Sequence, residues 1–211
     1  MERYINNFVP PKKVVPGHDT YASTLKHKNK SFVIGDSHLR RMNKRIFNKC
    51  SNSTYVKPFL GVNTKELDHH IIPTLVDQKP SSIIIHIGSN DITKSNYKYV
   101  NVKEVAERIS SIGLKCRRYG VNDIAISSIL VRNHSIINNL IIETNFYLKE
   151  LCLRNGFRFI SNDNISNNLL YKDGLHLSDK GTTVLANSFL QYFSSLSSDE
   201  RLRNVNMNYL D

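Results

Sequence analysis

Three side chains in this sequence are of the types that together carry out acyl transfer. Ser37 follows the apolar run Phe32–Ile34 in a Gly-Asp-Ser turn, and Asp173 and His176 stand three residues apart far downstream. Acyl transfer needs a hydroxyl that attacks a carbonyl, an imidazole that takes the hydroxyl proton, and a carboxylate that orients the imidazole. The sequence therefore contains the groups of a Ser-His-Asp triad.

Each of these residues, taken singly, also fits a structural role. A Gly-Asp-Ser sequence after a strand is commonly a tight turn with a helix cap, and Asp173-Gly174 is a common turn. His176 could be a buried histidine with satisfied hydrogen bonds, in which case His38 and His86 are the next candidates for the base. We favour catalysis only for the residues taken together, because the predicted strands place them at one edge.

Strand and helix patterns alternate from Ser31 onward, which is typical of a parallel sheet covered by helices on both faces. The predicted strands are Phe32–Gly35, Thr54–Pro58, Ser82–Ile87, Asn122–Ser127 and Phe157–Ile160. The predicted helices cover 38–47, a segment that begins after Asn63, 102–119, 136–154 and 182–193. We therefore predict an α/β protein with three α/β/α layers around a central five-stranded parallel sheet.

Two helix starts carry a recognisable cap. Asn63 and Glu66, and again Asn101 and Glu104, place an asparagine three residues before a glutamate. An asparagine at the cap accepts a backbone hydrogen bond, and the glutamate can bond back to the cap residue. The strand Ser82–Ile87 is the most continuous apolar run, so we expect it to lie centrally and to be buried on both faces.

The candidate site residues all fall at the ends of the predicted strands or before the predicted helices. Ser37, Gly61, Asn90 and the pair Asp173 and His176 each follow a strand or precede a helix. The carboxyl ends of parallel strands meet at one edge of a sheet, so one cleft could collect all of them. Asn90 can donate two N–H bonds, and Gly61 lets a backbone N–H approach a ligand closely. Singly, Asn90 could cap a helix and Gly61 could only turn the chain.

Four stretches in this order resemble the SGNH hydrolases, the superfamily that includes the GDSL esterases and lipases. The resemblance covers residues 31–193. Its motifs are Gly35-Asp36-Ser37, Gly61, Gly88-Ser89-Asn90-Asp91 and Asp173-Gly174-Leu175-His176. His38 stands where the leucine of the first motif often stands, outside the catalytic groups.

The resemblance implies a role for each matching residue. It makes Ser37 the nucleophile, His176 the base and Asp173 the carboxylate that orients the base. It implies an oxyanion hole made of the backbone N–H groups of Ser37 and Gly61 and the side-chain amide of Asn90. It also implies a flavodoxin-like sheet and a serine esterase that cleaves short acyl esters, above all acetyl esters, through an acyl-enzyme, with no cofactor and no metal ion.

The sequence is strongly basic, with a formal net charge of +11 and a pI near 9.6. The stretches 15–22 and 34–42 resemble esterase domains encoded by invertebrate mobile elements, including non-LTR retrotransposons. The cations Arg40, Arg41, Lys44 and Arg45 could hold such an enzyme near nucleic acid without sequence preference, or they could form a solvated helix face. The alternative to an esterase is therefore a nucleic-acid-associated binding or assembly module with vestigial hydrolysis.

The chain divides into three parts by composition. Residues 1–30 are a basic, irregular lead-in, 31–193 are the esterase domain, and 194–211 are a polar tail that we expect to fray. The amino terminus lacks the apolar core of a signal peptide, and no segment has the apolar length of a membrane span. We therefore expect an intracellular, cytoplasmic protein.

The cysteines and histidines do not form a metal or disulfide pattern. Cys50, Cys116 and Cys152 are odd in number and include no C-x-x-C pair, so neither a disulfide framework nor a zinc site is indicated. His69 and His70 are adjacent on a predicted helix and point in different directions, which favours a solvated pair. Walker A, G-x-S-x-G and H-E-x-x-H motifs are also missing.

Overall fold

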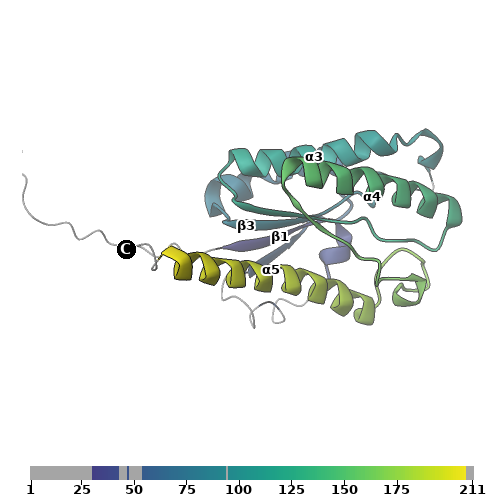
Figure 1. The fold of residues 1–211 in the computed structure, drawn as a ribbon. Helices are drawn as coiled ribbons and strands as arrows, with labels where there is room; N and C mark the ends of the chain where they lie inside the picture. Colours follow the sequence, from purple (N-terminus) through teal and green to yellow (C-terminus); the bar gives the residue numbers. More distant parts are fainter. Residues whose placement is uncertain (1–29, 43–46, 48–53, 94, 208–211) are drawn as a thin grey trace, which may run out of the picture.

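Five parallel strands form the centre of the protein (Figure 1). The computed structural model describes residues 30–42, 47, 54–93 and 95–207, with the backbone alone for 197–207. The strands are β1 (Ser31–Gly35), β2 (Thr54–Pro58), β3 (Ser82–His86), β4 (Asp123–Ser127) and β5 (Arg158–Ile160). They pair in the order β2-β1-β3-β4-β5, and every pair is parallel. This confirms the predicted sheet, with β3 in its centre.

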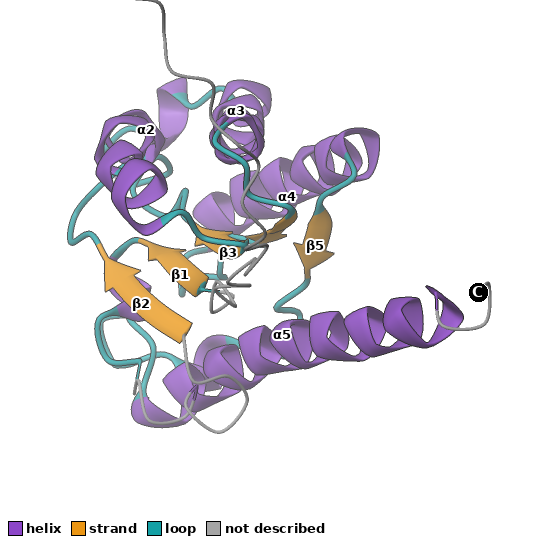
Figure 2. Cartoon of the chain, turned by 90° about the vertical axis from the view of Figure 1, so that its left-hand side faces the viewer, coloured by secondary structure: helices purple, strands orange, loops and turns teal. Residues whose placement is uncertain are grey.

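Helices cover both faces of this sheet, which confirms the three predicted layers (Figure 2). The long helices α3 and α4 lie on one face together with α2, and α5 lies on the other. The helices are α2 (Thr64–His70), α3 (Val102–Arg118), α4 (Ser135–Asn155) and α5 (Asp179–Met207), with a π-helical turn (Thr74–Gln78) after α2 and short 3-10 turns at Ser37–Leu39, Tyr97–Tyr99 and Asn167–Leu169.

The strands supply both halves of the core because their side chains alternate between the two faces. In β3, Ile83 and Ile85 pack with the side chains of α2, α3 and α4, and Ile84 packs on the opposite side with those of α5. All three are fully buried. An apolar run without polar alternation is therefore what a central strand with two covered faces requires.

The predicted helix caps are present. Asn63 and Glu66 form a reciprocal capping box at the start of α2. Asn101 accepts the backbone N–H of Glu104 at the start of α3, while the Glu104 carboxylate pairs with Arg108 instead of returning to the cap. These caps fix where each helix begins after its loop.

The structure differs from the predicted elements at two helices. The segment predicted as a helix over 38–47 begins with the 3-10 turn Ser37–Leu39, and 43–46 and 48–53 lie outside the described residues. The last helix, predicted over 182–193, extends from Asp179 to Met207. No glycine or proline follows Phe193 in that stretch, so nothing in the backbone chemistry stops the helix where the apolar pattern fades.

Candidate active site

The predicted nucleophile Ser37 lies in the turn that follows β1. Asp36 caps this turn, because its Oδ1 atom accepts the backbone N–H of His38 at 3.0 Å. The turn buries Asp36 and His38 and leaves Ser37 between them only half-buried. Ser37 is thus the member of the Gly-Asp-Ser-His stretch that faces the surface.

Gly35 brings this turn against the central strand. The backbone N–H of Asp36 donates to the carbonyl of His86 at 3.1 Å, and a Cβ atom on Gly35 would lie 1.8 Å from that same oxygen. No side chain fits at such a distance, so the position requires glycine. Gly35 therefore sets how closely the turn at Ser37 approaches the end of β3.

Asp173 and His176 form the second half of the site in the loop before α5. The Asp173 Oδ2 atom lies 2.7 Å from His176 Nδ1, and Asp173 Oδ1 accepts the backbone N–H groups of Leu175 at 2.9 Å and His176 at 3.0 Å. The hydrogen bond from Leu175, followed by those from His176, lowers the pKa of Asp173 to about 2. The carboxylate is ionised, so Nδ1 carries the hydrogen and Nε2 is the basic nitrogen of His176.

One cavity collects the three predicted triad residues. It has a volume of about 190 Å³, and Ser37, Asp173 and His176 all line it. The rest of its wall comes from His38, Arg40, Arg41, Tyr171, Leu177 and Thr182. The side chains of His176 and Asp173 are 47% and 49% exposed, so the cavity is open to solvent. The structure thus brings together residues that are far apart in the sequence.

Gly61 and Asn90, the other predicted site residues, do not line this cavity. Asn90 donates one amide hydrogen to the carbonyl of Val62 at 2.9 Å, which joins its turn to the loop that contains Gly61. Gly61 is exposed and has a φ of +76°, a conformation that favours glycine. The amide of Asn90 keeps a second hydrogen for a ligand. Their membership of an oxyanion hole stays a prediction.

Asp91 holds the same two loops together, a role that the sequence did not reveal. Its buried carboxylate accepts the backbone N–H of Thr64 at 3.0 Å and the Thr64 hydroxyl at 2.6 Å, and it lies 3.6 Å from Arg108. Burial raises the pKa of Asp91, against the hydrogen bonds and Arg108. The last residue of the Gly-Ser-Asn-Asp stretch therefore anchors the start of α2.

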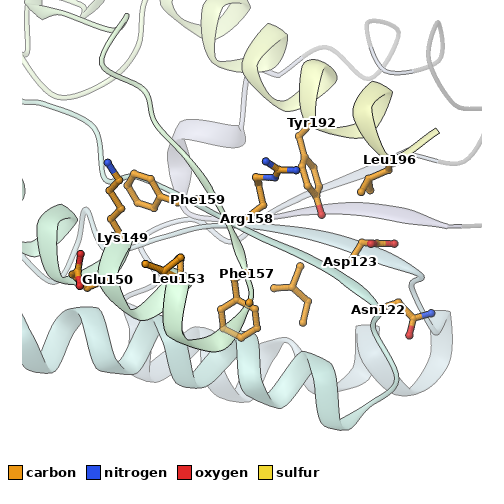
Figure 3. A pocket seen from close by; sticks show the side chains of 13 residues that line it. Asn122, Asp123, Lys149, Glu150, Leu153, Phe157, Arg158, Phe159, Tyr192 and Leu196 are labelled. Atoms are coloured by element: carbon orange, nitrogen blue, oxygen red, sulfur yellow. The ribbon is translucent and has the colours of Figure 1, made fainter. Parts of the chain in front are cut away.

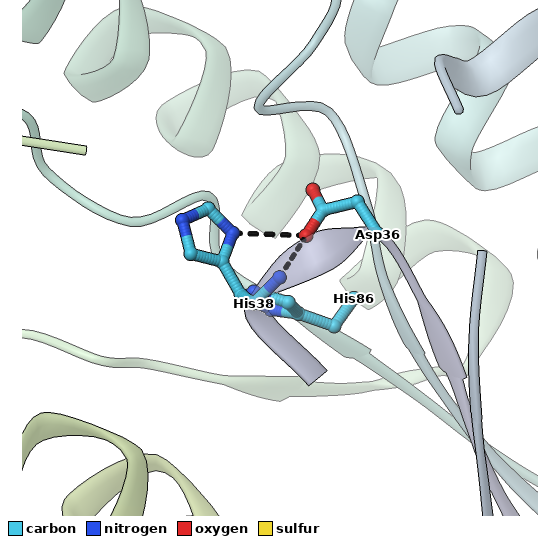
Figure 4. A group of neighbouring side chains, drawn as sticks. All are labelled: Asp36, His38 and His86. Atoms are coloured by element: carbon cyan, nitrogen blue, oxygen red, sulfur yellow. Dashed lines mark hydrogen bonds and ion pairs between the residues drawn. The ribbon is translucent and has the colours of Figure 1, made fainter. Parts of the chain in front are cut away.

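A buried polar group includes the two residues that flank Ser37 in the sequence (Figure 4). It consists of Asp36, His38 and His86, whose nitrogen and oxygen atoms lie within 4.8 Å of one another, a spacing that could hold a metal ion. His86 Nδ1 lies 2.9 Å from the hydroxyl of Ser127, and burial lowers the pKa of His86 to about 4, so this ring is neutral. The sequence signal was a histidine at the end of an apolar strand.

A larger cavity lies at the opposite edge of the sheet (Figure 3). Its volume is about 780 Å³, and its wall includes Asp123 and Arg158 at the first residues of β4 and β5, and Tyr192 of α5. Ser37, Asp173 and His176 do not line it. Chemistry that depends on Ser37 belongs to the smaller cavity, at the carboxyl ends of the strands.

The three-layer fold with its parallel sheet matches that of solved GDSL-type lipases and acylhydrolases. A GDSL-like lipase from Bacteroides thetaiotaomicron is similar with a TM-score of 0.69 and 16% identity, over 83% of this chain and 92% of that one. A lipase/acylhydrolase from Enterococcus faecalis has a TM-score of 0.65 and 14% identity, over 79% of this chain and 96% of that one.

A catalytic mutant of an acetylxylan esterase from Geobacillus stearothermophilus is also similar, with a TM-score of 0.66 and 16% identity, over 78% of this chain and 94% of that one. No protein-family model and no curated protein matches the sequence. At these identities the likeness establishes the fold. It does not support the narrower resemblance to esterase domains of mobile elements.

None of the helices within the described part of the chain is long and apolar enough to cross a membrane.

Proposed function

We propose that this protein is a serine esterase that hydrolyses short-chain acyl esters, above all acetyl esters. The observation that carries the proposal is the cavity lined by Ser37, Asp173 and His176. Asp173 Oδ2 lies 2.7 Å from His176 Nδ1, which leaves His176 Nε2 free to act as the base. The similarity in fold to lipases and an acetylxylan esterase supports the same reaction class.

The reaction proceeds in two halves. Ser37 Oγ attacks the acyl carbon while His176 Nε2 takes the hydroxyl proton, and the Asp173 carboxylate stabilises the imidazolium that forms. The tetrahedral intermediate then loses the alcohol, which receives that proton, and leaves the acyl group on Ser37. In the second half a water molecule gives its proton to His176 and attacks the acyl-enzyme, which releases the acid and restores Ser37.

The oxyanion of both intermediates would be stabilised by N–H donors from three segments. These are the backbone N–H of Ser37 at its 3-10 turn, the backbone N–H of Gly61 and the second amide hydrogen of Asn90. The bond from Asn90 to Val62 and the anchor of Asp91 on Thr64 support this assignment, because they hold the two loops in one arrangement. Donors fixed before the reaction need no reorganisation when charge develops.

The size of the cavity favours a small acyl group. Its volume of about 190 Å³ is below the roughly 300 to 1,000 Å³ of pockets that enclose drug-sized ligands. An acetyl group fits such a space, and a long acyl chain would extend into solvent. The similar Geobacillus enzyme is an acetylxylan esterase, which supports the same choice.

The test is hydrolysis of aryl esters whose acyl group lengthens from acetyl to octanoyl. We expect the wild type to cleave the acetyl ester best, and Ser37→Ala to remain folded with turnover lost, because only a small, half-buried hydroxyl is removed. Ser111→Ala, at an exposed serine of α3, is the matched control and should keep the wild-type rate. Near wild-type turnover by Ser37→Ala would show that another residue is the nucleophile.

A further inference from the structure

Both nitrogens of the His38 ring have acceptor partners. Nδ1 lies 2.9 Å from Asp36 Oδ1, and Nε2 lies 3.1 Å from the carbonyl oxygen of Leu175. The side chain is only 2% exposed, so water does not compete for these contacts. The Leu175 carbonyl belongs to the loop that carries His176, so the ring connects two segments that are 137 residues apart.

These partners determine the charge of the ring. A carbonyl oxygen can only accept a hydrogen bond, so Nε2 carries a hydrogen. Burial alone would raise the pKa of Asp36, but the charge and hydrogen bonds of His38 lower that pKa to about 2. Asp36 is therefore an ionised acceptor and Nδ1 carries a hydrogen as well. His38 is an imidazolium, paired in the interior with the carboxylate that precedes Ser37.

The groups around the ring act on its pKa in both directions. Burial lowers the pKa of His38, but the charge of Asp36, its hydrogen bond and the bond to Leu175 outweigh burial and raise that pKa overall. Arg132, from the loop before α4, acts against the protonated form. The ring of His86 on β3 lies 5.5 Å away and is neutral, and the ring of His176 lies 6.3 Å away.

A proton fits these contacts better than a metal ion. Two ligand atoms of a tetrahedral zinc, each about 2.0 to 2.1 Å from the metal, would lie about 3.3 Å apart. His38 Nδ1 and Asp36 Oδ1 are closer, at the 2.9 Å of a hydrogen bond, and the other ring nitrogen faces Leu175. Asp36 Oδ2 is left unpartnered among the described residues, and a single oxygen does not make a metal site.

We propose that His38 is a positioning residue. It is a buried imidazolium that fixes the turn at Ser37 and the loop that carries His176 relative to each other. Asp36 and His38 flank Ser37, and Leu175 precedes His176, so one ring sets the placement of both reacting groups. The proposal rests on the proposed esterase function for its effect on rate. The charge of the ring can be measured without turnover.

Loss of the proton from His38 would break this connection. A neutral imidazole has one N–H, so either Asp36 or the Leu175 carbonyl would lose its donor. The loop that carries His176 is also held by two backbone hydrogen bonds. Tyr171 N donates to His176 O at 2.7 Å, and Asn133 N donates to Gly174 O at 2.9 Å. The loop would therefore shift rather than unfold, and a shift of about 1 Å at reacting groups can cost about a hundredfold in rate.

The expected pH dependence has two limbs. An acid limb follows from the need for an unprotonated base, and activity falls on the alkaline side as His38 loses its proton. Because the pKa of His38 is raised by folding, the stability that its charge contributes is complete below the ordinary pKa of 6.5 and is lost as pH rises through the folded value.

The first test compares pH profiles of kcat for aryl acetate hydrolysis. His38→Leu, which supplies the leucine that the motif often has, should lower kcat by about 10- to 100-fold, leave KM near the wild-type value and remove the alkaline limb. His69→Gln, at an exposed histidine of α2, is the control and should keep both limbs. An unchanged alkaline limb in His38→Leu would overturn the proposal.

The second test needs neither turnover nor the variant's stability. Histidine ring signals are titrated by NMR in Ser37→Ala protein, with the His38 signal assigned by its absence from His38→Leu or by through-bond correlation. We expect one ring that stays doubly protonated above the ordinary histidine range. A His38 ring that is neutral at pH 7 would overturn the proposal, and an inactive wild type with a charged His38 would count against the esterase function alone.

Discussion

At the scale of single residues, Asn90 is the member of the site whose role can be separated most cleanly. One of its two amide hydrogens is committed to Val62, and the other is the predicted oxyanion donor. We expect Asn90→Ala to lower kcat by roughly a hundred- to a thousandfold with little change in KM, because the donor is needed most when charge develops on the carbonyl oxygen.

The control for this change is Asn96→Ala. Asn96 also donates its amide, to the carbonyl of Asp91 at 2.9 Å, but it lies at the far end of the same loop. Its loss should reduce stability and leave kcat within a few-fold of the wild type. Steady-state kinetics of the two variants make the comparison, and an effect of Asn90→Ala confined to KM would assign the amide to substrate binding.

Residue types and local spacing were enough to predict that Ser37, Asp173 and His176 lie together, but not the buried pair of Asp36 and His38. Asp173 and His176 are close in sequence, and a hydroxyl after a strand is recognisable by itself. The charge of His38 depends on Leu175, which only the fold brings near. Histidine in place of leucine marked His38 as unusual, but nothing local to it specified its second acceptor. The oxyanion donors remain predictions for the same reason, because their positions depend on two loops.

At the scale of elements, the connection between α2 and the Gly88–Asp91 turn depends on one carboxylate. Asp91→Ala removes two hydrogen bonds to Thr64 and the acceptor near Arg108. We expect a loss of about 2 to 4 kcal/mol in the free energy of unfolding, because hydrogen bonds to charged groups contribute about 1.5 to 3 kcal/mol each and do not add fully.

Urea unfolding measures this loss, and Asp163→Ala, at an exposed aspartate, is the matched control with an expected change within about 0.5 kcal/mol. A change as small for Asp91→Ala as for the control would mean that α2 does not depend on this anchor.

The elements themselves were largely predictable because the sequence marks their periods and their ends. β2 has the predicted bounds, and the capping box at Asn63 places α2 correctly. The extent of α5 was missed because its apolar face ends before its helix does, and no residue there signals a stop. The turn at Ser37–Leu39 was predicted as the first turn of a helix, since both can begin with the same cap and three residues are too few to distinguish a period of 3.0 from one of 3.6.

At the scale of the whole molecule, the net charge of +11 remains to be explained. Arg40 is exposed at the cavity, whereas Arg41 already contacts the Tyr171 ring at 4.7 Å and lies 3.7 Å from Asp179. Lys44 and Arg45 lie outside the described residues. If these four cations hold the protein near nucleic acid, single-stranded RNA should bind with an affinity that falls steeply as salt rises, since each neutralised phosphate releases counterions.

The discriminating variant replaces Arg40, Arg41, Lys44 and Arg45 by glutamine, and it should weaken binding and flatten the salt slope in fluorescence anisotropy. The control replaces the same number of exposed cations elsewhere, namely Lys65, Arg118, Lys149 and Arg154. Equal affinity of both variants would show that the basic face is only solvated. Aryl acetate hydrolysis is followed in parallel, because Arg40 and Arg41 border the cavity.

The openness of the triad has a consequence for the fate of the acyl group. His176 and Asp173 are about half exposed, so in the proposed reaction bulk water can reach the histidine that would activate it for attack on the acyl-enzyme. Enzymes that transfer an acyl group to an alcohol must keep water away from that intermediate. The half-exposed side chains of His176 and Asp173 offer no such shelter. Under the proposed function, added alcohols should therefore capture little of the acyl group, and the architecture is poorly suited to synthesis of esters by exchange.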